Sequence, residues 1–322
     1  MSIIGAAVRW GPWINLLMAV ITVGATLLSV AVFIASGAWR PSSIRGPRGL
    51  PEDEPLSPLV FIVAGGLSIW LFVPALILKL LHRGVPLDQI KPTQAETVVL
   101  GSVGPAIALA FMILGTVTRR RRGFATLGLS LDQAKRAIGP AIAGTIFIIP
   151  VVGWVAAITE AIFNKFHVQH PLKHELLEIL DVAPSPWLRV MIVIGAVIVA
   201  PLFEEFVFRG HLQTLLVRLL QQFGKRPSET GFPMVTASGE TVPAETAPTR
   251  GVVPDWVVKW LAVIVASILF ALVHEHWSIR IPIFALSLCF GYMYERTGNL
   301  WVPMFMHAMF NGLSIIASYS SH

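Results

Sequence analysis

The sequence predicts an all-α, polytopic bundle of about eight transmembrane helices. Hydrophobic residues make up 55% of the 322 residues and charged residues only 13%, and the mean hydropathy is +0.72. A chain this apolar does not fit the water-facing surface of an ordinary globular protein. Its apolar residues also gather in stretches close to the roughly 20 residues that a helix needs to cross the bilayer. We therefore expect an integral, multi-pass membrane protein.

Eight apolar stretches are candidates for these spans. They cover residues 12–36, 59–80, 98–118, 137–158, 188–208, 257–274, 279–294 and 299–317. The first stretch is too long for the core of a signal peptide and has no clear small-residue cleavage site, so we interpret it as a retained span. The last two stretches are short, and the fifth contains charged residues.

Composition also limits the cofactors and partners. The single cysteine, Cys289, excludes an internal disulfide and a cysteine-based metal cage. The net charge of +6 does not indicate nucleic-acid binding, because basic residues such as those at 119–122 lie in loops between spans. The lipid bilayer is the expected environment, which is the plasma membrane if the chain is bacterial, and no nucleic-acid partner is expected.

The chain divides in two by the polarity of its spans. Residues 1–182 hold apolar spans and their loops, whereas the spans within residues 183–318 carry ionisable groups. A polar segment at 221–255, rich in Pro, Thr, Gly and Glu, interrupts the second part. Because it lacks an apolar period, it predicts a disordered or loosely folded insertion. We expect the functional site within the last four spans.

The fifth stretch carries charges inside an apolar helix. It reads PLFEEFVFRG over residues 201–210, which places Glu204, Glu205 and Arg209 in one membrane segment. A charged group at the centre of a membrane helix costs about 2.5–3.5 kcal/mol, so such residues usually pair or face a cavity. Glu205 precedes Arg209 by four residues, the orientation that favours an ion pair. Glu204 points about 100° away. Its local alternative partner is His211, seven residues on, which keeps a purely structural ion network open.

Two later spans add histidines and an amide. FALVH places Phe270 four residues before His274, and HAMFN places His307 and Asn311 one turn apart on one face. A lone histidine in an apolar helix is more often a hydrogen-bonded core residue than a catalyst. Three spans with such groups at similar depth instead indicate a shared site, because unpaired polar groups are costly in hydrocarbon. We expect these groups and Glu204 to meet in one site.

The expected cluster suits hydrolysis of a carbonyl compound. A carboxylate and an imidazole can orient a water molecule and take its proton. A second histidine and an asparagine amide supply donors for a developing oxyanion. No serine or cysteine is spaced with these groups as an obvious nucleophile, so we expect an activated water as the attacking group.

The motifs occur in the order of a known family. EEFVFRG fits Glu-Glu-x-x-x-Arg, FALVH fits Phe-x-x-x-His, HAMFN fits His-x-x-x-Asn, and YERTGNLWVPMFMHAMFN resembles the typical final segment. Together they resemble the CPBP family of intramembrane proteases, also called the Abi or CAAX protease family, which includes the Ras-converting CAAX endopeptidases. The resemblance covers roughly residues 183–318, and the 221–255 insertion looks longer than usual for the family.

The resemblance implies a role for each motif residue. Glu204 would act as general base while His274 positions the water, and His307 with Asn311 would stabilise the oxyanion. Three further residues would support the site without taking part in the chemistry, namely Glu205, Arg209 and Phe270.

Metal use has two interpretations. Glu204, His274 and His307 could form a zinc site with a labile water, and the family has long carried a metalloprotease label. The spacing is not His-Glu-x-x-His, however, and similarity to the CAAX endopeptidases favours a glutamate-dependent mechanism without a metal. We therefore expect no cofactor, with zinc as the alternative.

The expected function is that of an intramembrane endopeptidase. It would hydrolyse a peptide bond near the C-terminus or in the membrane-proximal part of a protein or peptide substrate. One alternative is a non-catalytic bacteriocin-immunity or peptide-binding membrane protein, against which the intact motifs argue. Another is a proton-coupled transporter, since intramembrane Glu and His residues also form proton relays. The sequence shows no matching broken helices in two repeated halves, which argues against transport.

Overall fold

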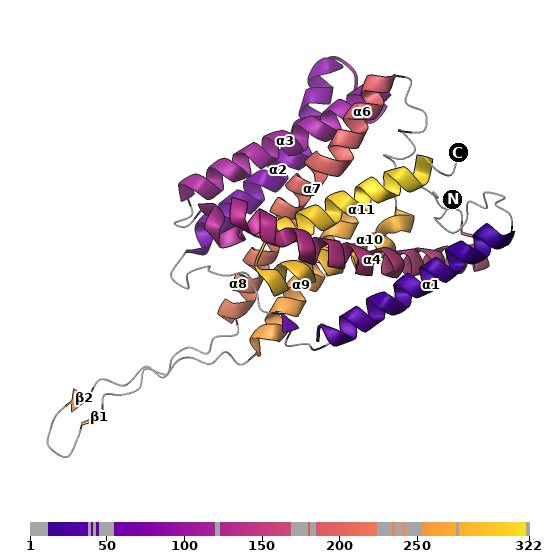
Figure 1. Ribbon diagram of the computed structural model, residues 1–322. Coiled ribbons are helices and arrows are strands. Elements are labelled where there is room, and N and C mark those ends of the chain that lie inside the picture. Colours follow the sequence, from indigo (N-terminus) through magenta and orange to yellow (C-terminus); the bar gives the residue numbers. More distant parts are fainter. Residues whose placement is uncertain are drawn as a thin grey trace.

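The computed structural model describes residues 12–37, 40, 43–44, 55–119, 123–168, 180, 185–223, 234–235, 241–242, 253–274 and 277–319. Within these residues the chain is a bundle of helices with one pair of two-residue strands (Figure 1). The predicted all-α fold class is confirmed.

Helices occupy all eight apolar stretches. The long helices of the first half are α1 (Pro12–Ala35), α2 (Leu56–Leu81), α3 (Gln94–Arg119) and α4 (Leu131–Lys165). The fifth stretch is one continuous helical rod made of α6 (Pro186–Ile194), η4 (Gly195–Val199), α7 (Ala200–Glu205), η5 (Phe206–Gln213) and α8 (Thr214–Phe223). The last three helices are α9 (Asp255–Leu272), α10 (Arg280–Thr297) and α11 (Trp301–Tyr319). Short 3₁₀ turns are η2 (Leu87–Gln89), η3 (Gly123–Leu127) and η6 (Trp277–Ile279).

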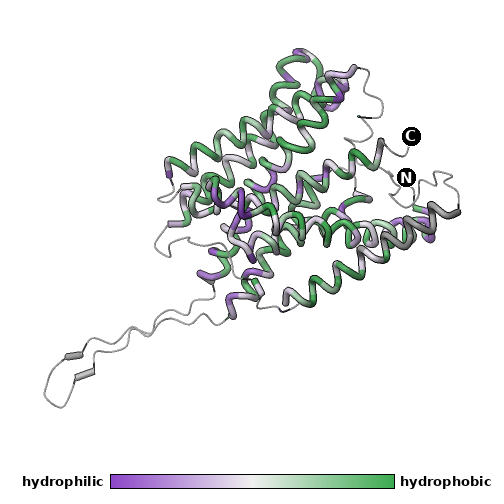
Figure 2. The backbone as a smooth tube through the Cα atoms, viewed as in Figure 1, coloured by the Kyte–Doolittle hydropathy of each residue, from purple (hydrophilic) through white to green (hydrophobic). Residues whose placement is uncertain are grey.

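Length and hydropathy make this a multi-pass membrane protein. In the described part of the chain, 5 helical segments are long and apolar enough to cross a membrane: Leu56–Leu81, Gln94–Arg119, Gly123–Lys165, Pro186–Gln222 and Asp255–Leu272. Hydrophobic residues run along most of α2 and α3 (Figure 2). The other three predicted spans are the helices α1, α10 and α11, which are not among these 5.

The fifth helix extends beyond the apolar stretch at 188–208. It continues to Phe223, so residues 221–223 of the predicted insertion are helical. The reason is burial: Gln213 and Thr214 are covered by neighbouring helices and hydrogen-bonded there. Polar residues in a membrane helix do not end it when other helices satisfy them.

The helices α2 and α3 pack closely through glycines. A Cβ atom on Gly66 would lie 2.5 Å from the Met112 sulfur, and one on Gly115 would lie 2.8 Å from the Ile62 side chain. Small residues let the backbones of membrane helices approach, because van der Waals contact rather than the hydrophobic effect joins them. Both helices begin at defined residues; the start of α3 is a capping box in which Thr93 and Glu96 bond each other's backbone N–H.

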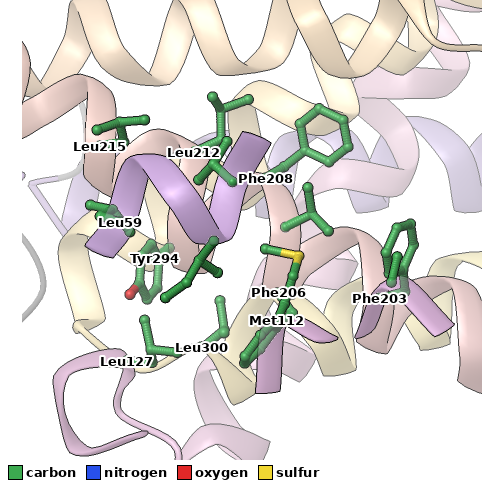
Figure 3. Close-up of a cluster of buried hydrophobic side chains, with 14 of the residues drawn as sticks. Leu59, Met112, Leu127, Phe203, Phe206, Phe208, Leu212, Leu215, Tyr294 and Leu300 are labelled. Atoms are coloured by element: carbon green, nitrogen blue, oxygen red, sulfur yellow. The ribbon is translucent and has the colours of Figure 1, made fainter. Parts of the chain in front are cut away.

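The main core lies where the fifth rod meets the α2–α3 pair. Phe203, Phe206 and Phe208 of the rod pack with Leu59 of α2 and Met112 of α3 (Figure 3). Leu127, Tyr294 and Leu300 belong to the same cluster, so loops and α10 also contribute (Figure 3). This core holds the segment with the two glutamates between both halves of the chain.

A second core joins α4 to the C-terminal helices. Ala141 and Ile148 of α4 pack against Phe290 of α10 and against Val302 and Met306 at the start of α11. Gly144 of α4 also faces Met306 closely, since a Cβ there would lie 2.6 Å from its methyl group. The helix α4, which belongs to the N-terminal part predicted from the sequence, thus packs against α10 and α11.

The predicted insertion is described only in part. Most of residues 224–252 lie outside the described residues. The described exceptions are β1 (Met234–Val235) and β2 (Thr241–Val242), which pair antiparallel and add a small element that the composition did not predict. Its two ends meet, because the amide of Gln221 donates to Asp255 at 2.9 Å.

Candidate active site

Glu204 and Glu205 end a short α-helix that is flanked by π-helical turns. The segment η4 precedes α7 and the segment η5 follows it, and both are π-helices. A π turn bonds residue i to residue i+5, is rare, and is frequent at functional sites. The wider turns change which side chains share a face further along η5, although Glu205 and Arg209 still meet at a spacing of four residues.

Glu205 forms the ion pair that its spacing predicts. Its Oε1 atom accepts from Nη1 of Arg209 at 3.2 Å, and both side chains are almost completely buried. Nη2 of Arg209 donates to the carbonyl and to the hydroxyl of Ser287 in α10, at 3.1 and 2.7 Å. A buried ion pair needs such added hydrogen bonds to offset the loss of hydration.

His307 lies between the two glutamates. Its Nδ1 atom is 2.9 Å from Oε1 of Glu205, and its Nε2 atom is 3.9 Å from Oε2 of Glu204. Within the described residues this Oε2 atom is buried and has no hydrogen-bond partner, although the side chain of Glu204 as a whole is 19% exposed. The His307 imidazole therefore lies between the buried carboxylate of Glu205 and the partly exposed carboxylate of Glu204.

The contacts of His307 assign its protons. Glu205 is paired with Arg209, so its carboxylate only accepts, and Nδ1 of His307 must donate to it. In a neutral ring, Nε2 would then be an acceptor facing the ionised Glu204, another acceptor. At 3.9 Å the two atoms do not bond directly. A proton on His307 would let Nε2 donate toward Glu204 and would leave the four-residue cluster without net charge, which matters in a low-dielectric interior.

Aromatic rings enclose this cluster. The ring of Phe290 stacks on His307 with centroids 5.1 Å apart, and the ring of Phe270 lies 6.1 Å from it. The guanidinium of Arg209 sits over Phe270 at 4.5 Å, within the range of a cation–π contact. The rings exclude water from the Glu205 side, and they fix the plane of the imidazole.

His274 lies just beyond the end of α9. The helix ends at Leu272, so the histidine is on the following turn rather than within the span. Its Nδ1 atom is 2.8 Å from the carbonyl oxygen of Phe270, and its ring lies 5.0 Å from the Phe270 ring. A carbonyl only accepts, so Nδ1 carries the proton and Nε2 of the neutral ring is an acceptor. Nε of Arg280 donates to the backbone carbonyl of His274 at 3.0 Å and holds this turn against α10.

Asn311 follows His307 by one turn of α11 and contacts the first π segment. Its Nδ2 atom donates to the carbonyl of Ala196 at 2.7 Å. One hydrogen of the amide is therefore anchored on η4, which fixes the direction of the other. The same contact joins α11 to the rod that carries Glu204.

The structure brings most of the predicted site residues together. Contacts connect Glu204, Glu205, Arg209, Phe270, His274 and His307 through shared rings and hydrogen bonds. Asn311 joins them through α11. His211 is placed elsewhere: its Nδ1 atom is 2.8 Å from the carbonyl of Phe206 and its Nε2 atom is 2.8 Å from the hydroxyl of Thr116. The expectation that it shares a face with Glu204 assumed an α-helix and is wrong, because η5 is a π-helix.

Two participants were missed by the sequence reasoning. Ser287 and Phe290 of α10 contact Arg209 and His307, yet α10 carries none of the three motifs. A serine four residues before a glycine in an apolar helix was the available signal, since polar residues in membrane helices mark interhelical contacts. The two π segments left no signal in the residue pattern that we used.

The donors for a metal site were tested on the same geometry. Among the described residues, no group of three or more His, Cys, Asp or Glu side chains is arranged to hold a metal ion. The three-ligand zinc set considered from the sequence is thus not assembled here, and no chemical step is derived through a metal.

Comparisons with known proteins agree with this location. A family model described as "Type II CAAX prenyl endopeptidase Rce1-like" matches residues 185–313. The chain is 23% identical over 141 residues to the Bacillus subtilis (strain 168) protein named "Putative membrane peptidase YdiL", which is 44% of this chain and 40% of that protein. It is 40% identical over 68 residues to "Uncharacterized protein YpbD" of the same organism, which is 20% of this chain and 34% of that protein.

The matches cover well under half of each curated relative, and no solved structure matches the chain significantly. The family match nevertheless contains all of the predicted site residues, from Glu204 to Asn311, in the order of the motifs. Over residues 185–313 the chain is therefore similar to the CAAX protease (CPBP) family, through these motifs, the family match and the similarity to a protein named as a putative membrane peptidase.

Proposed function

We propose that this protein is an intramembrane endopeptidase of the CAAX type that cleaves with a water activated by Glu204. Its substrate would be a protein or peptide cut near its C-terminus or next to the membrane. The observation that carries the proposal is the position of His307: one nitrogen contacts the sealed Glu205, and the other is 3.9 Å from a Glu204 oxygen that has no hydrogen-bond partner among the described residues. This is a carboxylate kept ready to accept a proton.

The reaction begins at Glu204. The separation of 3.9 Å from His307 is too long for a direct hydrogen bond and suits a bridging water. Glu204 takes a proton from the attacking water, whose oxygen bonds to the scissile carbonyl carbon. Nε2 of His274, an acceptor by the argument above, would hold the second proton of this water and direct its lone pair.

The tetrahedral intermediate carries a negative oxygen. His307 held as an imidazolium presents an Nε2–H, whose pull toward Glu204 weakens once that carboxylate has been neutralised by the water proton. The N–H can then stabilise the oxyanion together with the second amide hydrogen of Asn311. Collapse breaks the C–N bond while Glu204 returns its proton to the leaving nitrogen. No metal takes part in this proposal.

Cleavage of a quenched fluorogenic peptide library by the detergent-purified protein tests it. We expect the wild type to cleave and Glu204→Gln to be at least 10²-fold slower, since general-base catalysis contributes about 10²–10⁴-fold. Glu160→Gln in α4 is the matched control, because it removes a carboxylate from the same chain far from the motifs and should not alter the rate.

Each arm is repeated with a strong zinc chelator. Cleavage that requires Glu204 and survives the chelator supports the proposal. Cleavage that the chelator abolishes would instead indicate that the same side chains bind a metal ion. A wild type that cleaves nothing, while an active relative cuts the same library, would favour a binding or immunity function instead.

A further inference from the structure

The π-helical segment η5 directly follows Glu205 and is eight residues long. Most π-helices are single-turn bulges, because their geometry is poorer than that of the α-helix. A longer π segment therefore needs side-chain contacts that hold it. One lies within the segment, where Nδ1 of His211 faces the carbonyl of Phe206. Another comes from the first residue of α8, where the hydroxyl of Thr214 donates to the carbonyl of Arg209.

One external contact joins His211 to Thr116 of α3, and two further hydrogen-bonded contacts fall on one row of α10. Arg209 donates to Ser287, and Gln213, four residues later, donates to the carbonyl of Gly291 at 3.2 Å and to Oε1 of Glu295 at 2.9 Å. Ser287, Gly291 and Glu295 are themselves spaced by four residues and so lie along one face of α10. The π segment is thus fastened to α10 at two successive points.

The second point is built as tightly as the first. Gln213 and Glu295 are fully buried, and a Cβ on Gly291 would lie 2.8 Å from Oε1 of Gln213 and 3.0 Å from Val263. A larger residue at this position would press on the Gln213 amide and on Val263. Among the described residues, Oε1 of Gln213 and Oε2 of Glu295 have no hydrogen-bond partner, so the pair is retained despite a desolvation cost.

Glu205 connects the contacts of η5 with α10 to the candidate active site. Its Oε1 atom is shared by Arg209 and His307, so any rotation of η5 shifts the acceptor that orients His307. Arg209 bonds α10 from the middle of η5, and Gln213 bonds it from the last residue of the segment. These two contacts hold the second half of η5 against α10.

We propose that Gln213 and Glu295 are positioning residues for the Glu204–His307 pair, acting by locking η5 in its π-helical register against α10. This inference rests on the proposed peptidase function. The competing explanation is that the pair only joins helices, as polar side chains do in many membrane bundles.

The test combines kinetics with backbone amide exchange in the detergent-purified protein. Gln213→Met and Glu295→Met remove the contact at similar volume. We expect kcat to fall about 10²-fold with KM changed less than twofold, because small displacements of reacting groups have effects of that size. Amides within residues 206–213 should exchange faster in both variants. Glu295→Gln keeps an acceptor for Gln213 and should restore wild-type kcat and exchange.

Two controls separate positioning from folding. Thr145→Val removes a buried hydroxyl in α4 that has no hydrogen-bond partner among the described residues, and it should change neither readout. The double variant Gln213→Met/Glu295→Met leaves neither partner stranded, so it should fold even if a single variant does not, and it should show the same loss of kcat.

The outcomes are distinct. Unchanged kcat in the folded Met variants, or a fall in kcat without faster exchange in 206–213, overturns the inference. A wild type that cleaves no peptide overturns the proposed function instead, and amide exchange then still reports whether Gln213 and Glu295 hold η5. In that case, unchanged exchange would refute the lock itself.

Discussion

Two glutamates that are adjacent in the sequence have different surroundings in the structure. Glu205 is sealed against Arg209 and His307, and one of its oxygens is shared by both. Glu204 is partly exposed, and its Oε2 atom has no hydrogen-bond partner in the described structure. A general base needs an accessible environment like that of Glu204, because it must accept a proton from outside. A charge that orients other groups needs a buried, paired environment like that of Glu205.

This difference predicts separate effects of substitution. Glu204→Ala and His274→Ala should abolish cleavage and leave the yield of folded protein largely intact. Arg209→Ala should lower the folded yield, because it strands the buried Glu205; breaking a buried pair in this way costs about 3–5 kcal/mol. Size-exclusion chromatography in detergent measures the yield, and peptide cleavage measures the activity.

The double variant Arg209→Met/Glu205→Gln is the control for the stranded charge. It removes the ion pair without leaving a carboxylate unpaired, so its folded yield should exceed that of Arg209→Ala. An equal loss of folded protein in all of the single variants would contradict the division into catalytic and structural residues.

At the scale of elements, each helix contact is set by the size of a few residues. Glycines on α2 and α3 bring these helices together, and Gly291 admits Gln213 to the backbone of α10. The rod that contains the glutamates changes from α to π twice, and these changes aim Glu205 and Arg209 toward α10 while Glu204 faces the more open side.

Two glycines of α3 give a matched test of this packing. Gly115→Ala would place its Cβ 2.8 Å from Ile62, whereas Gly101→Ala meets nothing within 4 Å. Overpacking a buried contact costs about 1–3 kcal/mol, so we expect Gly115→Ala to lower the thermal midpoint in detergent and Gly101→Ala to leave it unchanged or raised. A Gly115→Ala protein as stable as the wild type would show that the α2–α3 contact can spread without cost.

At the scale of the whole molecule, the two halves of the chain form one body. Helices α2 and α3 supply part of the core around Phe203, Phe206 and Phe208, and α4 packs behind α10 and α11. The polar insertion enters this body at a single place, where α8 and α9 lie together and Gln221 bonds Asp255.

The closed ends of the insertion lead to a prediction. Replacing residues 226–250 with a flexible linker of about eight Gly and Ser residues should leave the folded yield and the cleavage of short peptides near wild type, because closing a loop costs little when its ends already meet. Gln221→Ala in the same background tests whether that hydrogen bond holds the ends. If the shortened protein folds but no longer cleaves peptides, the insertion contributes to the site or to substrate entry.

The sequence by itself determined the membrane location, the all-α class and the residues of the candidate site. These follow from local rules: apolar stretches of bilayer length become helices, and charged residues within them must meet partners. The pairing of Glu205 with Arg209 followed from a spacing of four residues and is confirmed. The assignment of Glu204, His274, His307 and Asn311 to catalysis remains a prediction drawn from the motifs.

Only the tertiary structure decided how these residues face one another. Ser287, Phe290 and the Gln213–Glu295 contact come from helix pairs distant in the sequence, and no periodicity within one helix reports them. The expectation for His211 assumed α-helical spacing, but His211 lies in the π-helical segment η5 and contacts Thr116 of α3. Contacts with neighbouring helices overcome the preference of a single helix for α geometry. Local patterns therefore identified the groups, while packing between helices set the directions of their side chains.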